Sequence, residues 1–383
     1  MKRSYIAKRF QSSGAGLSLD TEALAKYKDI IDLSIGDTDF TTDESIINAA
    51  FRDAKAGHTH YGDPKGDPEL IDAVCRAWEE DFGQRLPRDH VLVSASSCLG
   101  MALVMLAILD PGDEVIVFSP YFPMYREQIE LAGGVCVDVP TYASEDYAID
   151  EARLRAAITP RTKAIVFNNP TNPTGMGYDG KTLELLARVA QEHDLLIAAD
   201  EIYTTYLYEG DFRPIRTLPG MAERTITLNS FSKNFLMTGW RVGVIIAEPE
   251  LLAVMNRVNG SLIYSAPSIS QRAALQALAM RKEIREKYVT AYRDRIFYAA
   301  DRIEKLPYLS LVRPKGTFYL FPGVEKTGLD EKAFCKVLLD QAHVLVSPGT
   351  PFGVSAAGHF RIACTVGIDR LKAAFDRMEK LSF

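Results

Sequence analysis

The stretch "SFSKNFLMTGWRVG", residues 230–243, joins two apolar runs, "TITL" before it and "GVIIA" at its end. Such short apolar runs are typical of buried strands. A single lysine after a strand is most often a surface cation. Lys233, however, stands between serines and aromatic residues, and Arg241 follows eight positions later. We therefore expect Ser230, Lys233 and Arg241 to meet in one small volume.

Similar runs recur along the chain from about residue 90. The segments between them have apolar residues at helical spacing, for example Leu183, Leu186, Ala187 and Ala190. Strands that alternate with helices predict an α/β fold with a mostly parallel central sheet covered by helices on both faces. The expected strands are 114–118, 135–139, 163–167, 195–199, 225–228 and 243–247.

The last hundred or so residues have a different pattern. A long charged helical segment at 280–306 is followed by "GTFYLFPG", a helix, a short strand and "HFRIAC". This order predicts a smaller α+β domain. We assign residues 41–275 to a large domain, and residues 1–40 together with 276–383 to a small domain.

Polar residues follow three of the expected strands directly, in "NNPTNPTG", "DEIY" and "NSFSKNF". Ligands of open α/β sheets bind outside the carboxyl ends of the strands. We therefore expect Asn172, Asp200, Tyr203, Ser230 and Lys233 to lie on one rim of the sheet.

A helix is also expected to begin near this rim. The segment "SASSCLGMALVML", residues 94–106, leads from an apolar run into an apolar helix whose first residues include Ser96, Ser97 and Cys98. The free N–H groups of a helix N-terminus bind anions. An ordinary serine N-cap is the alternative, and this stretch alone leaves both open.

Residues 175–182, "GMGYDGKT", match the nucleotide-binding pattern G-x-x-x-x-G-K-[ST], and the apolar run ending at Asp200 resembles a magnesium-binding strand. In a phosphate-binding loop the first glycine follows its strand almost directly. Here residues 168–174, two of them prolines, intervene. We therefore disfavour a nucleotide site and expect Asp179 or Thr182 to cap a helix.

Composition is that of a globular protein, with 383 residues, 47% of them hydrophobic and 25% charged. A formal net charge of −6 argues against general binding to nucleic acid or anionic membranes. Five cysteines without C-x-x-C spacing fit reduced thiols better than disulfides or a metal site. Because we find no signal-peptide core and no membrane-spanning stretch, we expect a cytoplasmic protein.

The opening stretch closely resembles the S-x-S-K-x(5)-G-x-R-x-G signature of class I/II aminotransferases, fold-type I enzymes that depend on pyridoxal 5′-phosphate (PLP). The resemblance extends over nearly the whole chain and implies transamination by a ping-pong Schiff-base mechanism. The accompanying motifs are "IGDTDF" (35–40), "HTHYGDPKGDPEL" (58–70), "LDPGDEVIVFSPYFPMY" (109–125), "NNPTNPTG" (168–175), "DEIY" (200–203), "PKGTFYLF" (314–321), "SPGTPFG" (347–353) and "HFRIA" (359–363).

This resemblance implies roles for the residues around the cofactor ring. Lys233 would form the Schiff base with the cofactor aldehyde and later carry a proton between substrate and cofactor. Asp200 would pair with the pyridine nitrogen and keep it protonated. Asn172 and Tyr203 would hydrogen-bond the phenolic oxygen of the ring, and Phe122 would stack on its face.

The substrate and the phosphate would be held by further residues. By the same resemblance, Arg361 would bind the substrate α-carboxylate as a planar fork, with Gly36 and Asn172 nearby. The protein would be a homodimer in which Tyr61 reaches the phosphate of the partner subunit. The remaining phosphate ligands would be Ser96, Ser97, Cys98, Ser230 and Arg241.

Two departures bear on specificity. Relatives specific for dicarboxylates have a cation at a position aligned with Ser261 or with Cys98, and this chain has neither. We therefore expect a neutral, aromatic or broad-range L-amino acid as donor and a 2-oxo acid such as 2-oxoglutarate as acceptor. A thiol is also only a weak hydrogen-bond donor to phosphate. A C–S β-lyase, or another PLP enzyme on the same scaffold, is the alternative function.

Overall fold

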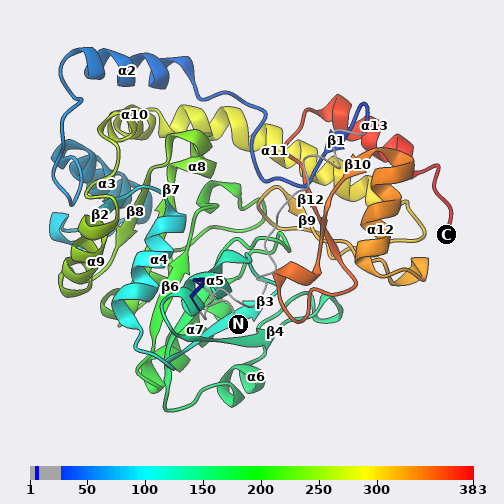
Figure 1. Ribbon diagram of the computed structural model, residues 1–383, viewed down its shortest axis with the longest axis horizontal. Coiled ribbons are helices and arrows are strands. Elements are labelled where there is room, and N and C mark those ends of the chain that lie inside the picture. The colour runs from blue at the N-terminus through cyan, green and yellow to red at the C-terminus, as the bar shows by residue number, and fades with distance from the viewer. Residues whose placement is uncertain (1–4, 8–26) are drawn as a thin grey trace.

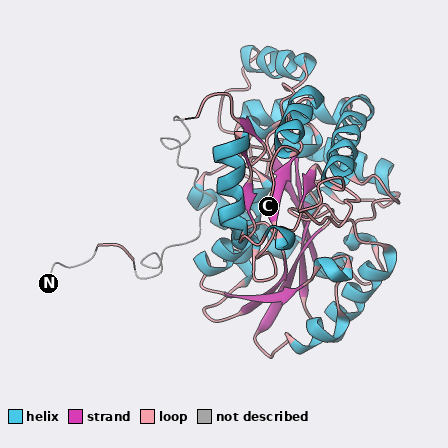
Figure 2. Ribbon diagram, turned by 90° about the vertical axis from the view of Figure 1, so that its right-hand side faces the viewer, coloured by secondary structure: helices cyan, strands magenta, loops and turns pink. Residues whose placement is uncertain are grey.

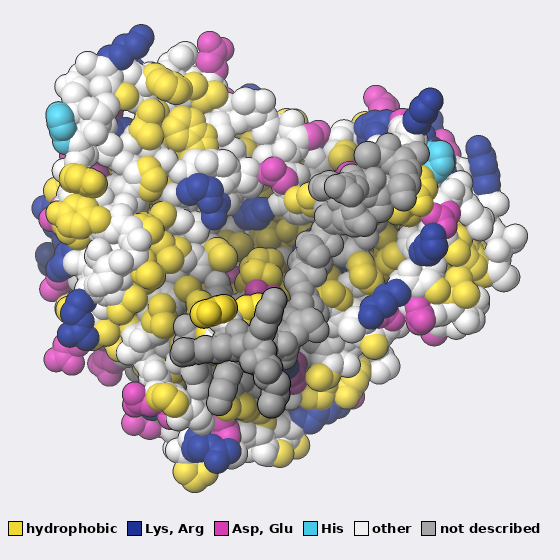
Figure 3. All heavy atoms as spheres, in the orientation of Figure 1, with side chains coloured by type: hydrophobic (Ala, Val, Ile, Leu, Met, Phe, Trp, Pro, Cys, Tyr) yellow, Lys and Arg dark blue, Asp and Glu magenta, His cyan; other side chains and the backbone are white. Residues whose placement is uncertain are grey.

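The computed structural model describes residues 5–7 and 27–383 (Figure 1). Most of the basic N-terminal segment, and with it much of the 1–40 portion assigned to the small domain, lies outside the described residues. Within the described chain, no helix is both long and apolar enough to cross a membrane. On the face shown in Figure 3, lysine and arginine side chains are interspersed with aspartate and glutamate, so this face carries mixed charge.

Seven strands of the described chain form the central sheet, in the order β2-β8-β7-β6-β5-β3-β4. Strand β8 runs antiparallel to its neighbours β2 and β7, and the other pairings are parallel. The expected mostly parallel sheet is confirmed. The strands are β2 (Val91–Ser94), β3 (Glu114–Ser119), β4 (Val135–Pro140), β5 (Thr162–Asn168), β6 (Leu196–Asp200), β7 (Thr225–Ser230) and β8 (Gly243–Ile246).

Helices cover both faces of this sheet (Figure 2). Successive residues of a strand point to opposite faces, so each strand contributes apolar side chains to both helix layers. In β3, for example, Val115 and Val117 pack in one hydrophobic cluster while Ile116 packs in another. The first face is covered by α4 (Ser97–Ile108), α5 (Met124–Leu131) and α9 (Pro249–Leu262). The second is covered by α3 (Pro68–Phe82), α6 (Glu151–Ala156), α7 (Gly180–Glu192) and α10 (Ser268–Ala279), and α2 (Glu44–Lys55) packs on the outer side of α10.

A second layer is built from the C-terminal third of the chain together with β1 (Ile31–Asp32). The helix α11 (Arg281–Ile303) connects the two parts: Tyr288 and Tyr292 pack with the large sheet's helices, whereas Ile296 and Ile303 pack in the second core (Figure 1). The other elements are the parallel pair β1 and β10 (Val344–Leu345), the antiparallel strands β9 (Tyr319–Leu320), β11 (Ser347–Pro348) and β12 (Phe360–Ala363), and the helices α12 (Glu331–Val337) and α13 (Ile368–Met378).

The nucleotide-like motif forms a helix cap. The Asp179 carboxylate accepts hydrogen bonds from the Thr182 backbone N–H (2.9 Å) and hydroxyl (3.0 Å) at the start of α7. The carbonyl of Gly175 accepts the N–H groups of Lys315 and Gly316, each at 2.8 Å. The segment is thus bonded to another loop of the chain and has the capping role expected for Asp179.

Candidate active site

A cavity of about 590 Å³ lies at the carboxyl-end rim of the central sheet, a size that suits a small-molecule site. Strand β8 runs opposite to its neighbours, so its first residues lie on the same rim as the last residues of the others. This direction brings Arg241, just before β8, to the end of β7. The cavity is lined by twelve of the residues expected in the site: Gly36, Ser96, Ser97, Cys98, Phe122, Asn172, Asp200, Tyr203, Ser230, Lys233, Arg241 and Arg361.

Lys233 points into this cavity from the short helix α8 (Phe231–Asn234). Its Nζ donates a hydrogen bond to the carbonyl oxygen of Gly36 and lies 5.8 Å from the centroid of the Phe318 ring. A Cβ atom at Gly36 would come within 1.8 Å of the Tyr319 hydroxyl. Only glycine therefore lets this backbone carbonyl approach the lysine at this point.

Asp200 is the last residue of β6 and is only 6% exposed. Tyr125 donates its hydroxyl proton to one carboxylate oxygen, Oδ2, while the other, Oδ1, is buried without a hydrogen-bond partner. Burial raises the pKa of Asp200 to about 6, although the hydrogen bond from Tyr125 acts in the opposite direction. A buried acceptor without a partner costs free energy, so this oxygen is suited to a protonated nitrogen of a ligand.

Tyr203 and Tyr319 meet beside this carboxylate, with their hydroxyl oxygens 3.1 Å apart. Burial, together with the neighbouring phenol, raises the pKa of Tyr203 well above its usual value. The Tyr203 phenol is therefore neutral at physiological pH. It can donate a proton in a hydrogen bond to an anionic oxygen in the cavity.

Arg361, in β12, is only 4% exposed and pairs with no carboxylate of the described residues. It donates from Nη1 to Asn172 Oδ1 (3.1 Å) and from Nη2 to the Ser34 carbonyl (2.5 Å). Its guanidinium carbon lies 4.7 and 4.9 Å from the ring centroids of Tyr319 and Phe352. Its Nε has no partner, and burial lowers the pKa of the group. A buried cation in these surroundings is suited to an anionic ligand.

The opposite end of the cavity is formed by the start of α4. Ser96 has a φ of +112°, a region that glycine normally occupies. Its hydroxyl accepts the Leu99 N–H (3.1 Å), and its carbonyl accepts the Ser94 hydroxyl (2.8 Å), so local bonds hold this strained backbone. A Cβ at Gly243 would come within 2.7 Å of the Ser97 nitrogen, which explains a glycine there. The hydroxyl of Ser96 thus serves as the N-cap of α4, which is one of the two roles that the sequence left open for this stretch.

Ser230 and Arg241 face the same end. The Ser230 hydroxyl caps α8 by accepting the Ser232 N–H (3.1 Å). Arg241 has a φ of +53°, is exposed, and donates from Nη1 to the Thr238 carbonyl (2.8 Å). It forms no ion pair with the carboxylates of the described chain and so presents an uncompensated cation.

Cys98 belongs to this end as well. Partial desolvation raises the pKa of its thiol, so the group is neutral. Gln128, whose side chain is mostly buried, donates to the Cys98 carbonyl (2.8 Å) and to its sulfur (3.4 Å). Because Gln128 lies on α5, these hydrogen bonds hold the first turn of α4 against α5.

Tyr61 is the one expected site residue that does not line the cavity. It lies beyond the end of α2, is 87% exposed, and its ring makes an edge-to-face contact with Tyr264 at 5.2 Å. A single chain therefore leaves this tyrosine apart from the other expected phosphate ligands.

Among the cavity-lining residues that were not singled out from the sequence, Tyr125, Gln128 and Tyr319 bond directly to expected site residues. Each lies within or just beyond a motif already quoted. Tyr125 and Gln128 are three residues apart on α5, a spacing that places them at neighbouring positions of one helix face. This three-residue spacing is visible in the sequence, but the partners of these side chains come from distant segments.

The fold and the cavity together define the class of protein, an α/β protein whose small-molecule site contains a lysine, a buried carboxylate and a buried arginine. The model of the family described as aminotransferase class I and II matches residues 28–378. The chain therefore belongs to the class I and II aminotransferases, which use PLP as cofactor.

Several relatives are similar over nearly the whole chain. An aspartate/prephenate aminotransferase of Thermus thermophilus is 39% identical over 357 residues, which cover 92% of this chain and 91% of the relative. An arginine–pyruvate transaminase of Pseudomonas aeruginosa is 35% identical, covering 99% and 97%. The crystal structure of an aromatic aminotransferase from Pyrococcus horikoshii has a TM-score of 0.90 at 34% identity, covering 94% of this chain and 97% of that one.

The residues of the cavity fit this cofactor. The unpartnered Oδ1 of Asp200 suits a protonated pyridine nitrogen, and the helix start at Ser97 with Arg241 suits a phosphate. When bound, PLP supplies an electron sink for charge that develops at the substrate α-carbon.

Proposed function

We propose that this aminotransferase takes the amino group from neutral or aromatic L-amino acids, with broad range, and transfers it to a 2-oxo acid such as 2-oxoglutarate. One observation carries this proposal. The guanidinium of Arg361, buried and without a carboxylate partner, faces the same cavity as Lys233 and Asp200. A cation for an α-carboxylate, an amine and a buried carboxylate are the groups that transamination requires.

In this proposal Arg361 orients the substrate by its α-carboxylate, and Asn172 and the Ser34 carbonyl hold the guanidinium plane. Lys233 Nζ moves the proton at the substrate α-carbon. Its present hydrogen bond to the Gly36 carbonyl holds the amine at the wall of the cavity, within reach of a bound ligand. Asp200 holds a proton on the ligand nitrogen beside it, because Tyr125 fixes the carboxylate from the other side.

The cavity also supports a choice among donors. Its lysine and arginine lining residues within the described chain are Lys233, Arg241 and Arg361, each assigned a role above. The remaining wall toward the solvent includes Ile35 and Pro351, and the additional carboxylate of Asp37. A second carboxylate on the substrate would find repulsion here and no spare cation. This composition supports neutral or aromatic donors over aspartate and glutamate.

The same proposal includes the assembly and the compartment. Tyr61, Leu262, Ile263 and Tyr264 are large and exposed, which is characteristic of surfaces that contact another protein. We infer a homodimer in which Tyr61 reaches the partner's phosphate site. Five free cysteines support a reducing compartment such as the cytoplasm. We keep the division into a large domain, 41–275, and a small domain, 1–40 plus 276–383.

The test is a panel of L-amino acids added to the purified holoenzyme, first without and then with 2-oxoglutarate. Loss of the yellow cofactor band without acceptor, and glutamate formation with it, should be faster for phenylalanine or leucine than for aspartate by about tenfold or more in kcat/KM. Aspartate as the best donor would overturn the specificity. Pyruvate and ammonia released from a cysteine conjugate without any acceptor, as the main reaction, would favour the lyase instead.

A further inference from the structure

A second cavity, of about 140 Å³, shares a wall with the active site. The segment 229–235 lines both cavities: Ser232 and Lys233 face the active site, whereas Phe231 and Phe235 face the second cavity. The opposite walls are supplied by α3, by β8 and by the junction of α10 and α11. The active-site chemistry described above makes no use of this space.

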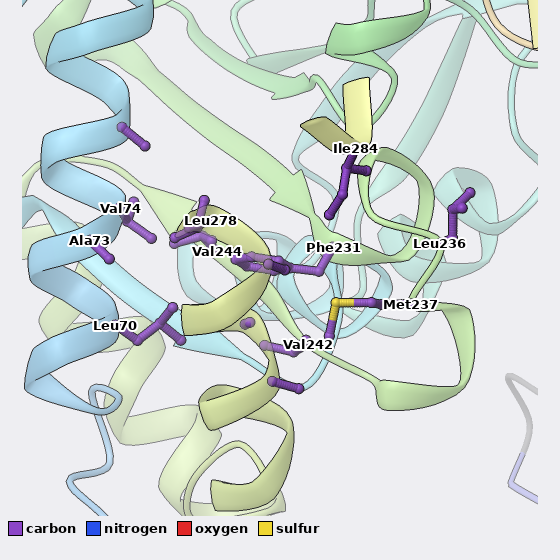
Figure 4. Packing of buried hydrophobic residues seen from close by; sticks show 14 of the residues in the cluster. Leu70, Ala73, Val74, Phe231, Leu236, Met237, Val242, Val244, Leu278 and Ile284 are labelled. Atoms are coloured by element: carbon purple, nitrogen blue, oxygen red, sulfur yellow. The ribbon is translucent and has the colours of Figure 1, made fainter. Parts of the chain in front are cut away.

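The interior of the second cavity is mostly apolar. Its polar lining side chains are already satisfied: Asn234 is hydrogen-bonded to Thr204, Thr205 and Asn229, and Ser230 caps α8. Figure 4 shows Val74, Phe231, Val244 and Leu278 side by side at this place. Trp78, on α3, adds an aromatic wall. An apolar cavity of roughly 150 Å³ in another protein stays dry and binds benzene. The second cavity therefore has the size and the lining for one six-membered ring.

The exposed residues that line it are all charged: Asp81, Lys282 and Arg285. Asp81 is already paired with Arg281, at 3.4 Å. Lys282 and Arg285 form no ion pair with any carboxylate of the described chain, and they are three residues apart on α11, on neighbouring positions of one helix face. The solvent side of the cavity thus carries two uncommitted cations.

We propose that this second cavity is a binding site for a small aromatic monocarboxylate, whose ring enters the apolar interior and whose carboxylate meets Lys282 and Arg285. The site is separate from the substrate site. An occupant would contact Phe231 and Phe235, which flank Lys233 in the chain, and so would stabilise the segment that carries the lysine.

The experiment uses phenylacetate as the probe and Trp78 as the reporter. The chain has two tryptophans, so in Trp240→Phe holoenzyme the fluorescence comes from Trp78 alone. The added substitution Arg361→Ala removes carboxylate binding at the substrate site. We expect phenylacetate to change Trp78 fluorescence saturably and to raise the melting temperature in this background.

Two further variants test the site itself. Ala77→Phe, which places a ring inside the cavity, should weaken phenylacetate binding about tenfold or more. The double variant Lys282→Glu with Arg285→Glu should weaken it about fivefold or more while toluene binding stays within about twofold. The charge-matched control, Lys326→Glu with Lys332→Glu, changes two exposed lysines of the second layer and should leave both unchanged.

A saturable response that Ala77→Phe and the charge reversal both weaken supports the proposal. Absence of a saturable response, or undiminished binding in Ala77→Phe, overturns the site. Equal effects of the charge reversal on phenylacetate and toluene overturn its preference for a carboxylate. Should Ala77→Phe fail to fold, the exposed Lys282 and Arg285 pair still tests the proposal, because its substitution changes no core contact.

Discussion

The two ends of the active-site cavity satisfy their polar groups in different ways. At the end around Asp200 and Arg361, the charged groups are buried and each retains one polar atom without a partner. At the end around Ser96, Ser230 and Arg241, the hydroxyls already cap helices and the cation is exposed. At the first end, buried polar atoms lack a hydrogen-bond partner until a ligand supplies one. At the second end, the polar groups can bind either a ligand or water.

This difference predicts where substitutions act most strongly. A buried charge that loses or lacks its partner costs several kcal/mol, but an exposed one costs little because water screens it. Substitutions at the buried end should therefore change activity and stability strongly. Those at the end around Ser96, Ser230 and Arg241, which we call the phosphate end after its proposed ligand, should change mainly the affinity for the cofactor.

The largest effect is expected for Lys233→Ala, which removes the amine that lines the same cavity as both ends. We expect kcat to fall by at least about 10³-fold, because the variant lacks the amine that moves the proton. Cofactor should still bind, since the groups at both ends remain. Activity and the visible spectrum after desalting measure the two effects. Lys181→Ala, in the nucleotide-like motif, is the matched control and should retain activity; full activity in Lys233→Ala would refute the role of this lysine.

Asp200→Asn should abolish turnover and yet raise the stability of the cofactor-free protein. Turnover should be lost, yet the cofactor-free variant should be more stable than the wild type by about 2–3 kcal/mol above pH 6, because burial raises the pKa of Asp200 from about 4 to about 6. Ionisation is thus disfavoured in the folded state. The wild type should lose stability relative to the variant as the pH rises from about 4 to about 6, with a constant difference above that range.

Thermal midpoints of both cofactor-free proteins between pH 4.5 and 8 measure this difference. Asp179→Asn, at the exposed cap of α7, is the control and should show no gain above pH 6. A difference between wild type and Asp200→Asn that does not vary with pH would mean that burial of the charge is not the cause.

Arg361→Lys should reduce kcat/KM about 10²-fold, with cofactor affinity unchanged. Lysine keeps the charge but lacks the planar fork that donates to Asn172 and Ser34 while facing a carboxylate. Steady-state kinetics with the best donor measure the loss, and Arg313→Lys, an exposed ion-paired arginine, is the control. A loss confined to cofactor affinity would show that Arg361 belongs to the phosphate end.

Much of the end around Asp200 and Arg361 could be predicted from the sequence, because the carboxyl ends of parallel strands lie on one rim of the sheet. Apolar runs indicated the strands, and the residues that follow them, such as Asp200 and Lys233, had to share a rim. The antiparallel direction of β8 was not predictable, since an apolar run has no direction. Nor were the contacts of Tyr125 with Asp200 and of Tyr319 with Tyr203, which join residues 75 and 116 positions apart.

The phosphate end was less predictable for two physical reasons. The φ of +112° at Ser96 depends on local hydrogen bonds from Ser94 and to Leu99, and a serine gives no sign of a backbone conformation that usually requires glycine. The expected position of Tyr61 depends on a second chain, so no pattern within one chain tests it. Sequence motifs named these residues without fixing their geometry.

The smallest effect is expected for Tyr61→Phe, which removes one exposed hydroxyl. Loss of one hydrogen bond to a phosphate should weaken cofactor binding about tenfold and leave kcat unchanged at saturating PLP. Equilibrium titration of the cofactor-free protein with PLP measures this change. Tyr264→Phe, which keeps the neighbouring ring, is the control.

Mixed dimers would then decide whether Tyr61 acts on its own chain or on the partner. In a dimer of one Lys233→Ala chain and one Tyr61→Phe chain, action across the interface gives the chain with Lys233 an intact Tyr61 from its partner. That site should bind PLP with wild-type affinity and be active at a PLP concentration that leaves the Tyr61→Phe homodimer mostly empty. If Tyr61 served its own chain, the same site would keep the weakened affinity. Activity at limiting PLP therefore distinguishes a phosphate end shared between two chains from one completed within a single chain.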